Sequence, residues 1–185
     1  KDCNGDGQVS ILDANCISVN RVDNLLEDLA DIDGDGLLDL LEVPGFDPNA
    51  TGNVFFNSHG IEDLDGASQL KNAELLDLWD NRITSIERGD VDGLPNLQDL
   101  RLGGNGITSI ERGAFDGLTN LQDLHLEGNQ LMAIESGEFY GLTRLQFLVF
   151  NDNRLTGIET GDFEGLSNLK TLVHMGNRLT SIERG

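Results

Sequence analysis

Basic residues are scarce in this chain of 185 residues. Lys and Arg together number 12 against 33 Asp and Glu, so the formal net charge is -21. Because nucleic-acid phosphates are bound mainly by Lys and Arg, this composition predicts no nucleic-acid partner. It argues equally against anionic membrane surfaces. The acidic excess suits cation binding, or it serves only to keep the surface well solvated.

Long apolar runs and catalytic groups are also sparse. No apolar run approaches the length of a membrane-spanning helix and no signal peptide is readable, so we expect no membrane insertion. The three histidines are His59, His125 and His174. None has a Ser, a Cys or paired carboxylates at a spacing that suggests a nucleophile or an acid–base pair. With no glycine-rich phosphate loop either, the sequence predicts a protein that is not an enzyme.

Two acidic windows near the start of the chain have the spacing of calcium-binding loops: DCNGDGQVSILD (2–13) and DIDGDGLLDLLE (31–42). Such a loop needs oxygen ligands at positions 1, 3, 5 and 12, a backbone carbonyl at position 7 and a glycine at position 6. The ligands predicted in this way are Asp2, Asn4, Asp6, Gln8 and Asp13 in the first window, and Asp31, Asp33, Asp35, Leu37 and Glu42 in the second. The pattern predicts two bound calcium ions, and two unmetallated acidic turns are the plainer alternative.

Between the two windows, residues 14–30 are expected to form a helix with one apolar face. A loop followed by a helix, without an entering helix, resembles the bacterial dockerin module over residues 2–43. That resemblance implies EF-hand-like calcium binding and docking to a cohesin domain. The chain departs from the dockerin pattern after Glu42, where Pro44, Gly45 and Pro48 end any second helix. Calcium binding therefore carries over better than docking.

Cys3 and Cys16 are the only cysteines, and both lie in the first loop–helix unit. Neither has the company of zinc ligands. A disulfide between them, closing a short calcium loop, would suit an exported protein. Two buried thiols remain the alternative, because the sequence does not supply the geometry of their Cβ atoms.

The rest of the chain is periodic, as NLQDLRLGGNGITSIERGAFDGLT and NLQDLHLEGNQLMAIESGEFYGLT show. Equivalent positions recur every 24 residues at Leu100, Leu124, Leu148 and Leu172, and at Asn105, Asn129, Asn153 and Asn177. This pattern, L-x-x-L-x-L-x-x-N-x-L, resembles the leucine-rich repeat of the 24-residue extracellular type. The resemblance implies an α/β-type solenoid, a right-handed horseshoe with short parallel strands on its concave face. Each ladder Asn should turn inward to satisfy backbone groups.

The sequence thus predicts a small helical double calcium-loop module at 1–43, a connection at 44–53 and a leucine-rich repeat domain at 54–185. The first strand is expected at residues 54–56, with His59 as a structural residue in the place of the ladder Asn. No C-terminal cap is readable, so we expect the natural protein to continue past Gly185. Leu40, Leu41 and Val43 are expected to shield the core beside the first strand, because an open strand edge invites pairing with other chains.

The concave face is the expected binding surface, because exposed aromatic side chains on a rigid face are typical anchors for a partner. Its predicted contact residues are Phe55, Asp77, Trp79, Arg101, His125, Glu127, Phe147 and Val149. Apolar residues gather toward the two ends of the face and charged residues lie between them. The alternative for Phe147 and Val149 is that residues after Gly185 cover them.

Together these patterns predict a secreted or cell-surface, calcium-binding repeat protein that binds a protein or glycan through its concave face. The alternative is a dockerin-type assembly module, in which the acidic loops bind a cohesin-like partner and the repeats serve as cargo or spacer.

Overall fold

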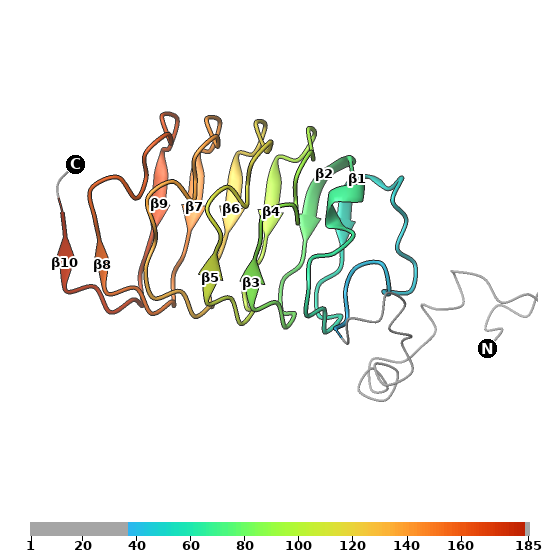
Figure 1. Ribbon diagram of the computed structural model, residues 1–185, viewed down its shortest axis with the longest axis horizontal. Helices are drawn as coiled ribbons and strands as arrows, with labels where there is room; N and C mark the ends of the chain where they lie inside the picture. The colour runs from blue at the N-terminus through green and yellow to red at the C-terminus, as the bar shows by residue number, and fades with distance from the viewer. Residues whose placement is uncertain (1–36, 184–185) are drawn as a thin grey trace, which may run out of the picture.

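The computed structural model describes residues 37–183, which form a stack of coils. Each coil adds one short strand to a six-stranded parallel sheet of order β1-β2-β4-β6-β7-β9 (Figure 1). These strands are β1 (Thr51–Phe55), β2 (Asn72–Asp77), β4 (Asp99–Arg101), β6 (Asp123–His125), β7 (Phe147–Val149) and β9 (Thr171–Val173). The predicted solenoid of stacked parallel strands is confirmed.

The repeat pattern fixes the register of this sheet. Leu76, Leu100, Leu124 and Leu148 stand at equivalent positions of neighbouring strands and are fully buried. The residues on either side of each leucine point the other way, because successive side chains of a strand alternate between its two faces. We call this outward side of the six strands the strand face. The 24-residue spacing therefore predicts correctly which side chains are neighbours across it.

Two small sheets run along a second side of the coils. One joins β3 (Ser85–Ile86) to β5 (Ser109–Ile110), and the other joins β8 (Gly157–Ile158) to β10 (Ser181–Ile182). In Figure 1 these strands lie along the lower edge of the stack. Within residues 37–183, no strand forms at the equivalent place in the coil between β5 and β8, where the sequence is Ala133-Ile134.

The core is one continuous column of leucine, isoleucine and phenylalanine running through the coils. Phe115, Phe139 and Phe163 stack on one another, with ring centroids 6.2 and 6.3 Å apart and planes inclined by 9°. Burial of such a column stabilises the fold by about 25 cal/mol for each Å² of apolar surface removed from water. Because each ring packs mainly on the next coil, the coils stabilise one another in sequence.

The regular spacing of asparagine builds a hydrogen-bond ladder inside the stack. Asn105 donates through Nδ2 to the carbonyls of Leu78, Leu102 and Gly103 at 3.0, 3.0 and 3.2 Å. Its Oδ1 accepts from the N–H of Ile83 at 3.1 Å. Asn81, Asn129, Asn153 and Asn177 repeat this arrangement. The predicted inward turn of the ladder is confirmed.

His59 stands at the ladder position of the first coil, and its side chain contacts residues of the same coil. Its ring nitrogen Nδ1 lies 2.8 Å from the carbonyl of Asn57, and its ring meets Phe56 edge-on at 6.0 Å. These contacts fit the predicted structural role of His59.

The first strand begins earlier than predicted, at Thr51 instead of Val54. Thr-Gly-Asn reads as a turn, yet it continues the pairing with β2 through a register shift between Gly52 and Asn53. Gly52 has a φ of 71°, a backbone conformation that glycine adopts without the steric cost a Cβ brings. The bulge at this point extends a strand that the sequence alone ends too soon.

Residues 37–43 cover the open side of the first coil. Leu40 and Val43 are buried and belong to the core. The Leu40 N–H donates to the Asp65 carbonyl at 3.2 Å, and the Glu62 N–H donates to the Leu38 carbonyl at 2.7 Å. Shielding of the core by Leu40 and Val43 is confirmed. Leu41 was expected to join them, but its side chain is 37% exposed.

An α/β-type chain with a helical module in front was expected, but the part that the structure describes is built from strands and turns. Its one helical segment is the 3₁₀ turn η3 (Ala67–Gln69). The helix expected at 14–30 lies outside the described residues. No helix within 37–183 is long and apolar enough to span a lipid bilayer.

Candidate functional site

The predicted contact residues all lie on strands of the six-stranded sheet or within two residues after them. Phe55 pairs with Asp77, Asp77 with Arg101, Arg101 with His125, and His125 with Val149. Trp79 follows β2, Glu127 follows β6 and Phe147 begins β7. The strand face therefore brings these side chains together as one surface, with apolar groups at either end of a charged band.

Large apolar side chains stay open to solvent on this face. Phe55 is 54% exposed, Phe147 is 41% exposed and Trp79 is 37% exposed. Trp79 lies against Gly103 on the next coil, where an added Cβ would stand 2.5 Å from the indole Cζ3. The missing side chain of Gly103 is what allows the indole to lie flat across two coils.

The first part of the charged band is a guanidinium held between carboxylates. Arg101 donates to Asp99 through Nε at 3.1 Å and through Nη2 at 2.7 Å, and its Nη1 lies 3.9 Å from Asp77. The hydrogen bonds that Arg101 donates to the Asp99 carboxylate raise the pKa of Arg101. A bidentate pair of this kind holds both side chains in one geometry. The Arg101 charge is therefore largely engaged within the face.

The second part of the band contains an ionisable pair and an unpaired carboxylate. His125 Nδ1 lies 3.3 Å from Glu127 Oε1, and this hydrogen bond raises the pKa of His125. Burial, together with the nearby charge of Asp99, raises the pKa of Asp123. Within residues 37–183, the Asp123 carboxylate forms no hydrogen bond or ion pair. The band therefore offers an acidic position that lacks its own cation.

The predicted calcium ligands fall mostly outside the described residues, and so do Cys3 and Cys16. Leu37 is 40% exposed and Glu42 is 7% exposed. Asp39, at position 9 of the second loop, accepts through Oδ1 from the N–H groups of Leu41 and Glu42 at 2.6 and 3.3 Å. Over residues 37–183 no group of three His, Cys, Asp or Glu side chains could hold a metal ion. Calcium binding stays a prediction.

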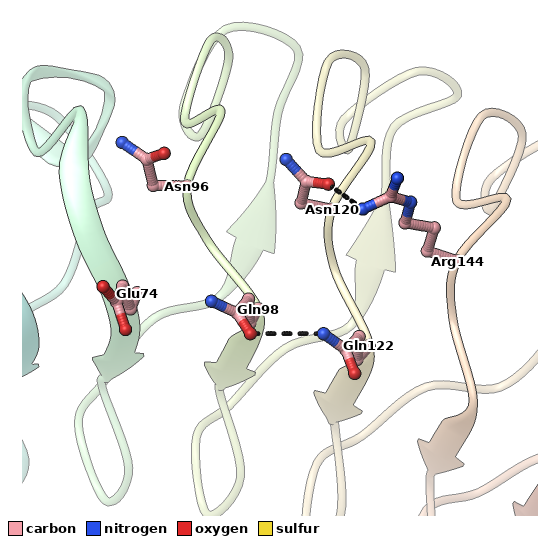
Figure 2. A pocket seen from close by; sticks show the side chains of 6 residues that line it. All are labelled: Glu74, Asn96, Gln98, Asn120, Gln122 and Arg144. Atoms are coloured by element: carbon pink, nitrogen blue, oxygen red, sulfur yellow. Dashed lines mark hydrogen bonds between the residues drawn. The ribbon is translucent and has the colours of Figure 1, made fainter.

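A polar groove beside the strand face was missed by the sequence reading. Two rows of side chains line it, just ahead of the strands (Figure 2). The inner row, which we call the amide row, is Glu74, Gln98, Gln122, Gln146 and Lys170, and the outer row is Asn96, Asn120, Arg144 and Asn168. We call the space between the rows the edge groove. Its signal was present in the sequence, as glutamine and asparagine recurring 24 residues apart.

Comparison with known proteins identifies the family of the repeats. A family model described as leucine rich repeat matches residues 71–131 and 126–179, which together span 71–179, or 109 of the 185 residues. A search of curated proteins gave no match. No catalytic family matches the chain, and leucine-rich repeat proteins are generally binding scaffolds.

Among solved structures, the crystal structure of the TLR13–ssRNA13 complex is similar to the chain. Its sequence is 27% identical over the matched part and its TM-score is 0.54. The match covers 72% of this chain but 21% of that one, so this chain spans about a fifth of the length of the solved protein.

This likeness corrects one prediction. The acidic composition predicts no nucleic-acid partner, but a similar stack of repeats is solved in a complex with single-stranded RNA. The exclusion is wrong because total charge does not describe the local surface that a solenoid presents. A chain can be acidic as a whole and still carry a cationic patch on one side of its coils.

Proposed function

The chain belongs to the leucine-rich repeat family, and on that premise we propose that it is a non-enzymatic binding protein whose strand face holds a partner protein. The observation that supports this most is the exposure of three aromatic side chains on one rigid sheet, Phe55, Trp79 and Phe147. Buried aromatic anchors supply most of the energy of typical interfaces. Their positions toward both ends of the face suit a partner long enough to reach across several coils.

The charged band indicates the chemistry of that partner. Asp77, Asp99, Asp123 and Glu127 outnumber Arg101 and His125, and Arg101 is engaged by Asp99. A Lys or Arg side chain of a partner placed beside Asp123 would supply the cation that this carboxylate lacks. The proposed partner segment therefore carries a basic residue flanked by apolar ones. Complementary charge of this kind favours specificity and fast association.

A single-stranded RNA is less well suited to the strand face, because its phosphates need several free cations. The aromatic side chains could stack on bases, but the carboxylates of the band would repel the backbone. We therefore favour protein, and RNA is carried as a competing outcome of the test.

We also propose that the protein is exported and that the loops at 2–13 and 31–42 bind two calcium ions. Support comes from the ligand spacing of both loops and from the two cysteines of the first loop–helix unit, Cys3 and Cys16. Asp39 and Glu42 stay compatible with this role, since Asp39 caps the turn that carries Glu42.

The test of the strand face uses the whole chain and two probe pools in parallel. A displayed library of random peptides and a pool of random single-stranded RNA are each selected against the immobilised protein. We expect enriched peptides that carry Lys or Arg between apolar residues. Trp79→Ala and Asp123→Asn should each weaken their binding about tenfold or more, while thermal unfolding stays nearly unchanged.

Met132→Ala is the matched control, because Met132 is 62% exposed but lies off the strand face. It should leave peptide binding unchanged. Selection of RNA in preference to peptides would replace the proposed partner class. A large loss of stability in Trp79→Ala would show that the indole is part of the core, which would remove it as an anchor.

A further inference from the structure

The edge groove consists of two neighbouring hollows of about 270 and 310 Å³ that share Gln122 and Arg144. Both are lined almost entirely by carboxamide and charged side chains. Figure 2 shows the two rows facing each other across the first hollow, with the amide row nearer the strands. The strand face and the groove are separate surfaces, so a ligand of the groove goes beyond the partner proposed above.

The hydrogen bonds along the amide row all run in one direction. Lys170 Nζ donates to Gln146 Oε1 at 2.7 Å, Gln146 Nε2 donates to Gln122 Oε1 at 3.2 Å, and Gln122 Nε2 donates to Gln98 Oε1 at 3.2 Å. An ammonium group only donates, so Lys170 forces each amide oxygen to face the following coil. The last amide nitrogen, on Gln98, then points toward Glu74 (Figure 2), a carboxylate that only accepts when ionised.

The outer row is held by the backbone of the preceding turn. Asn120 Nδ2 donates to the Pro95 carbonyl and Asn168 Nδ2 donates to the Thr143 carbonyl, each at 2.6 Å. Asn120 Oδ1 accepts from Arg144 Nη1, also at 2.6 Å. These bonds fix the amides and still leave most donors of Arg144 available, because a guanidinium carries five N–H groups.

One end of the groove is cationic in a chain that is strongly acidic. Arg144 and Lys170 both line the second hollow. In the part of the chain that the structure describes, neither forms an ion pair, and each donates to an amide oxygen instead. A positively charged hollow beside neutral amides is therefore built into the edge of the sheet.

We propose that the edge groove binds an acidic oligosaccharide, with a sugar carboxylate in the hollow of Arg144 and Lys170 and neutral sugar hydroxyls along the amides. A hydroxyl group both donates and accepts, as the carboxamides of the groove do. The planar guanidinium of Arg144 matches a carboxylate through two parallel hydrogen bonds. No aromatic side chain lines either hollow, so the groove lacks the stacking surface that single-stranded nucleic acid uses.

The chain itself supplies the variants that test this. Arg144→Asn and Lys170→Gln each introduce the residue that other coils already carry in the same row, so both should fold. Isothermal titration of the full chain uses a tetrasaccharide of uronic acid residues, a neutral tetrasaccharide of glucose and a short single-stranded RNA. We expect the uronate tetrasaccharide to bind more tightly than the neutral tetrasaccharide and the RNA. Added salt should lower the affinity for the uronate tetrasaccharide.

Each variant should lower the affinity for the uronate tetrasaccharide about tenfold, the effect of losing one charge-assisted contact. Binding of the neutral tetrasaccharide should be unchanged. Arg154→Gln is the matched control, because it removes one exposed cation elsewhere and gives the residue found one coil earlier at Gln130. The proposal would be overturned if the uronate tetrasaccharide failed to bind, or if it bound the Arg144→Asn, Lys170→Gln double variant as tightly as the unmodified chain. It would also be overturned if RNA bound more tightly than the uronate tetrasaccharide and both variants weakened that binding. None of these results depends on the strand face.

Discussion

Gly103 determines where the indole of Trp79 can lie. A Cβ at this position would stand 2.5 to 2.8 Å from three carbons of the ring, so the ring would have to move. We expect Gly103→Ala to push the indole into water, to shift its fluorescence to longer wavelength and to cost about 1 kcal/mol of stability. Trp79 is the only tryptophan, so the emission spectrum reports it directly.

Gly106→Ala is the control for this prediction, because the Cβ added there meets its nearest atom, the Ile83 carbonyl oxygen, at an ordinary 3.5 Å. Its emission spectrum should match that of the unmodified chain. An unshifted spectrum in Gly103→Ala would mean that the indole does not rest on Gly103.

Glu138 should make stability fall as pH rises. Its side chain is 4% exposed, and burial, reinforced by the charges of Glu135 and Asp162, raises its pKa from 4.5 to about 7. The folded state then holds this proton more tightly than the unfolded chain. The stabilisation is complete below pH 4.5 and is lost as pH rises through about 7.

Glu138→Gln stays uncharged, so it should unfold at a higher temperature than the unmodified chain at about pH 8 and at a similar temperature at about pH 4. The difference should be at most about 3 kcal/mol, since one pKa unit corresponds to 1.36 kcal/mol. Thermal unfolding across this pH range measures it. Replacing the exposed Glu164 by Gln should leave the curve unchanged, and an equal shift at both pH values would contradict the prediction.

The roles of some single side chains can be predicted from the sequence, and the roles of others cannot. The ladder of Asn81, Asn105 and Asn129 is readable, because its role follows from a fixed place in every repeat. The contact of Trp79 with Gly103 is not readable, because it depends on which residue happens to stand one coil away. The edge groove was missed for a related reason: a single Gln or Asn is an ordinary surface residue, and only its neighbours at 24-residue spacing make a row.

Among the elements, the gap between β5 and β8 has a local cause. In the coils on either side, a threonine hydroxyl bonds to the threonine carbonyl of the preceding coil: Thr108 to Thr84 at 3.3 Å and Thr180 to Thr156 at 3.0 Å. Met132 stands at this position between them and has no hydroxyl. The sheet along the second side therefore divides into two pairs of strands.

We expect Met132→Thr with Ala133→Ser to join the two pairs. The new hydroxyl can donate to the Thr108 carbonyl, as its equivalents do, and such a bond adds about 1 kcal/mol. Urea unfolding should show the gain, and amide hydrogen exchange should slow around residues 132–134. Met132→Ala, which adds no hydroxyl, should give neither effect. Unchanged exchange at residues 132–134 in the double substitution would show that the methionine is not the cause of the gap.

The strands also mark the limits of prediction at this scale. The positions of β2, β4, β6, β7 and β9 follow from the alternation around the inward-facing leucine of each strand. The start of β1 does not, because the bulge at Gly52 lets a turn-like sequence continue the pairing. Pro44 was expected to end any second helix, and residues 40–42 form a turn. The exposure of Leu41, in contrast, depends on packing that no sequence pattern contains.

For the molecule as a whole, the segment at 37–43 links the acidic loops to the repeats. Leu40 and Val43 are part of the same core as the leucine column. If calcium orders the second loop, which ends at Glu42, its binding should stabilise the whole stack. An ion that binds only the folded state adds about 2.7 kcal/mol at a hundredfold excess over its dissociation constant.

Thermal unfolding followed by Trp79 fluorescence, with calcium and with a chelator, tests this linkage. We expect a lower midpoint in the chelator. Asp33→Asn with Asp35→Asn should give the low midpoint even in calcium, whereas Asp47→Asn, outside both loops, should not. The same midpoint with and without calcium would mean that the metal and the repeats are independent.

The gap beside Met132 also has a mechanical consequence. When the stack is pulled from its two ends, every coil carries the same load, because each one touches mainly the next. The first rupture is expected at a seam that only the six-stranded sheet crosses, as on either side of the coil that carries Met132. Each coil that peels away lengthens the chain by roughly 80 Å, at about 3.4 Å for each of its extended residues. Under tension the protein would part near its middle into two blocks, each of which keeps its own pair of lateral strands.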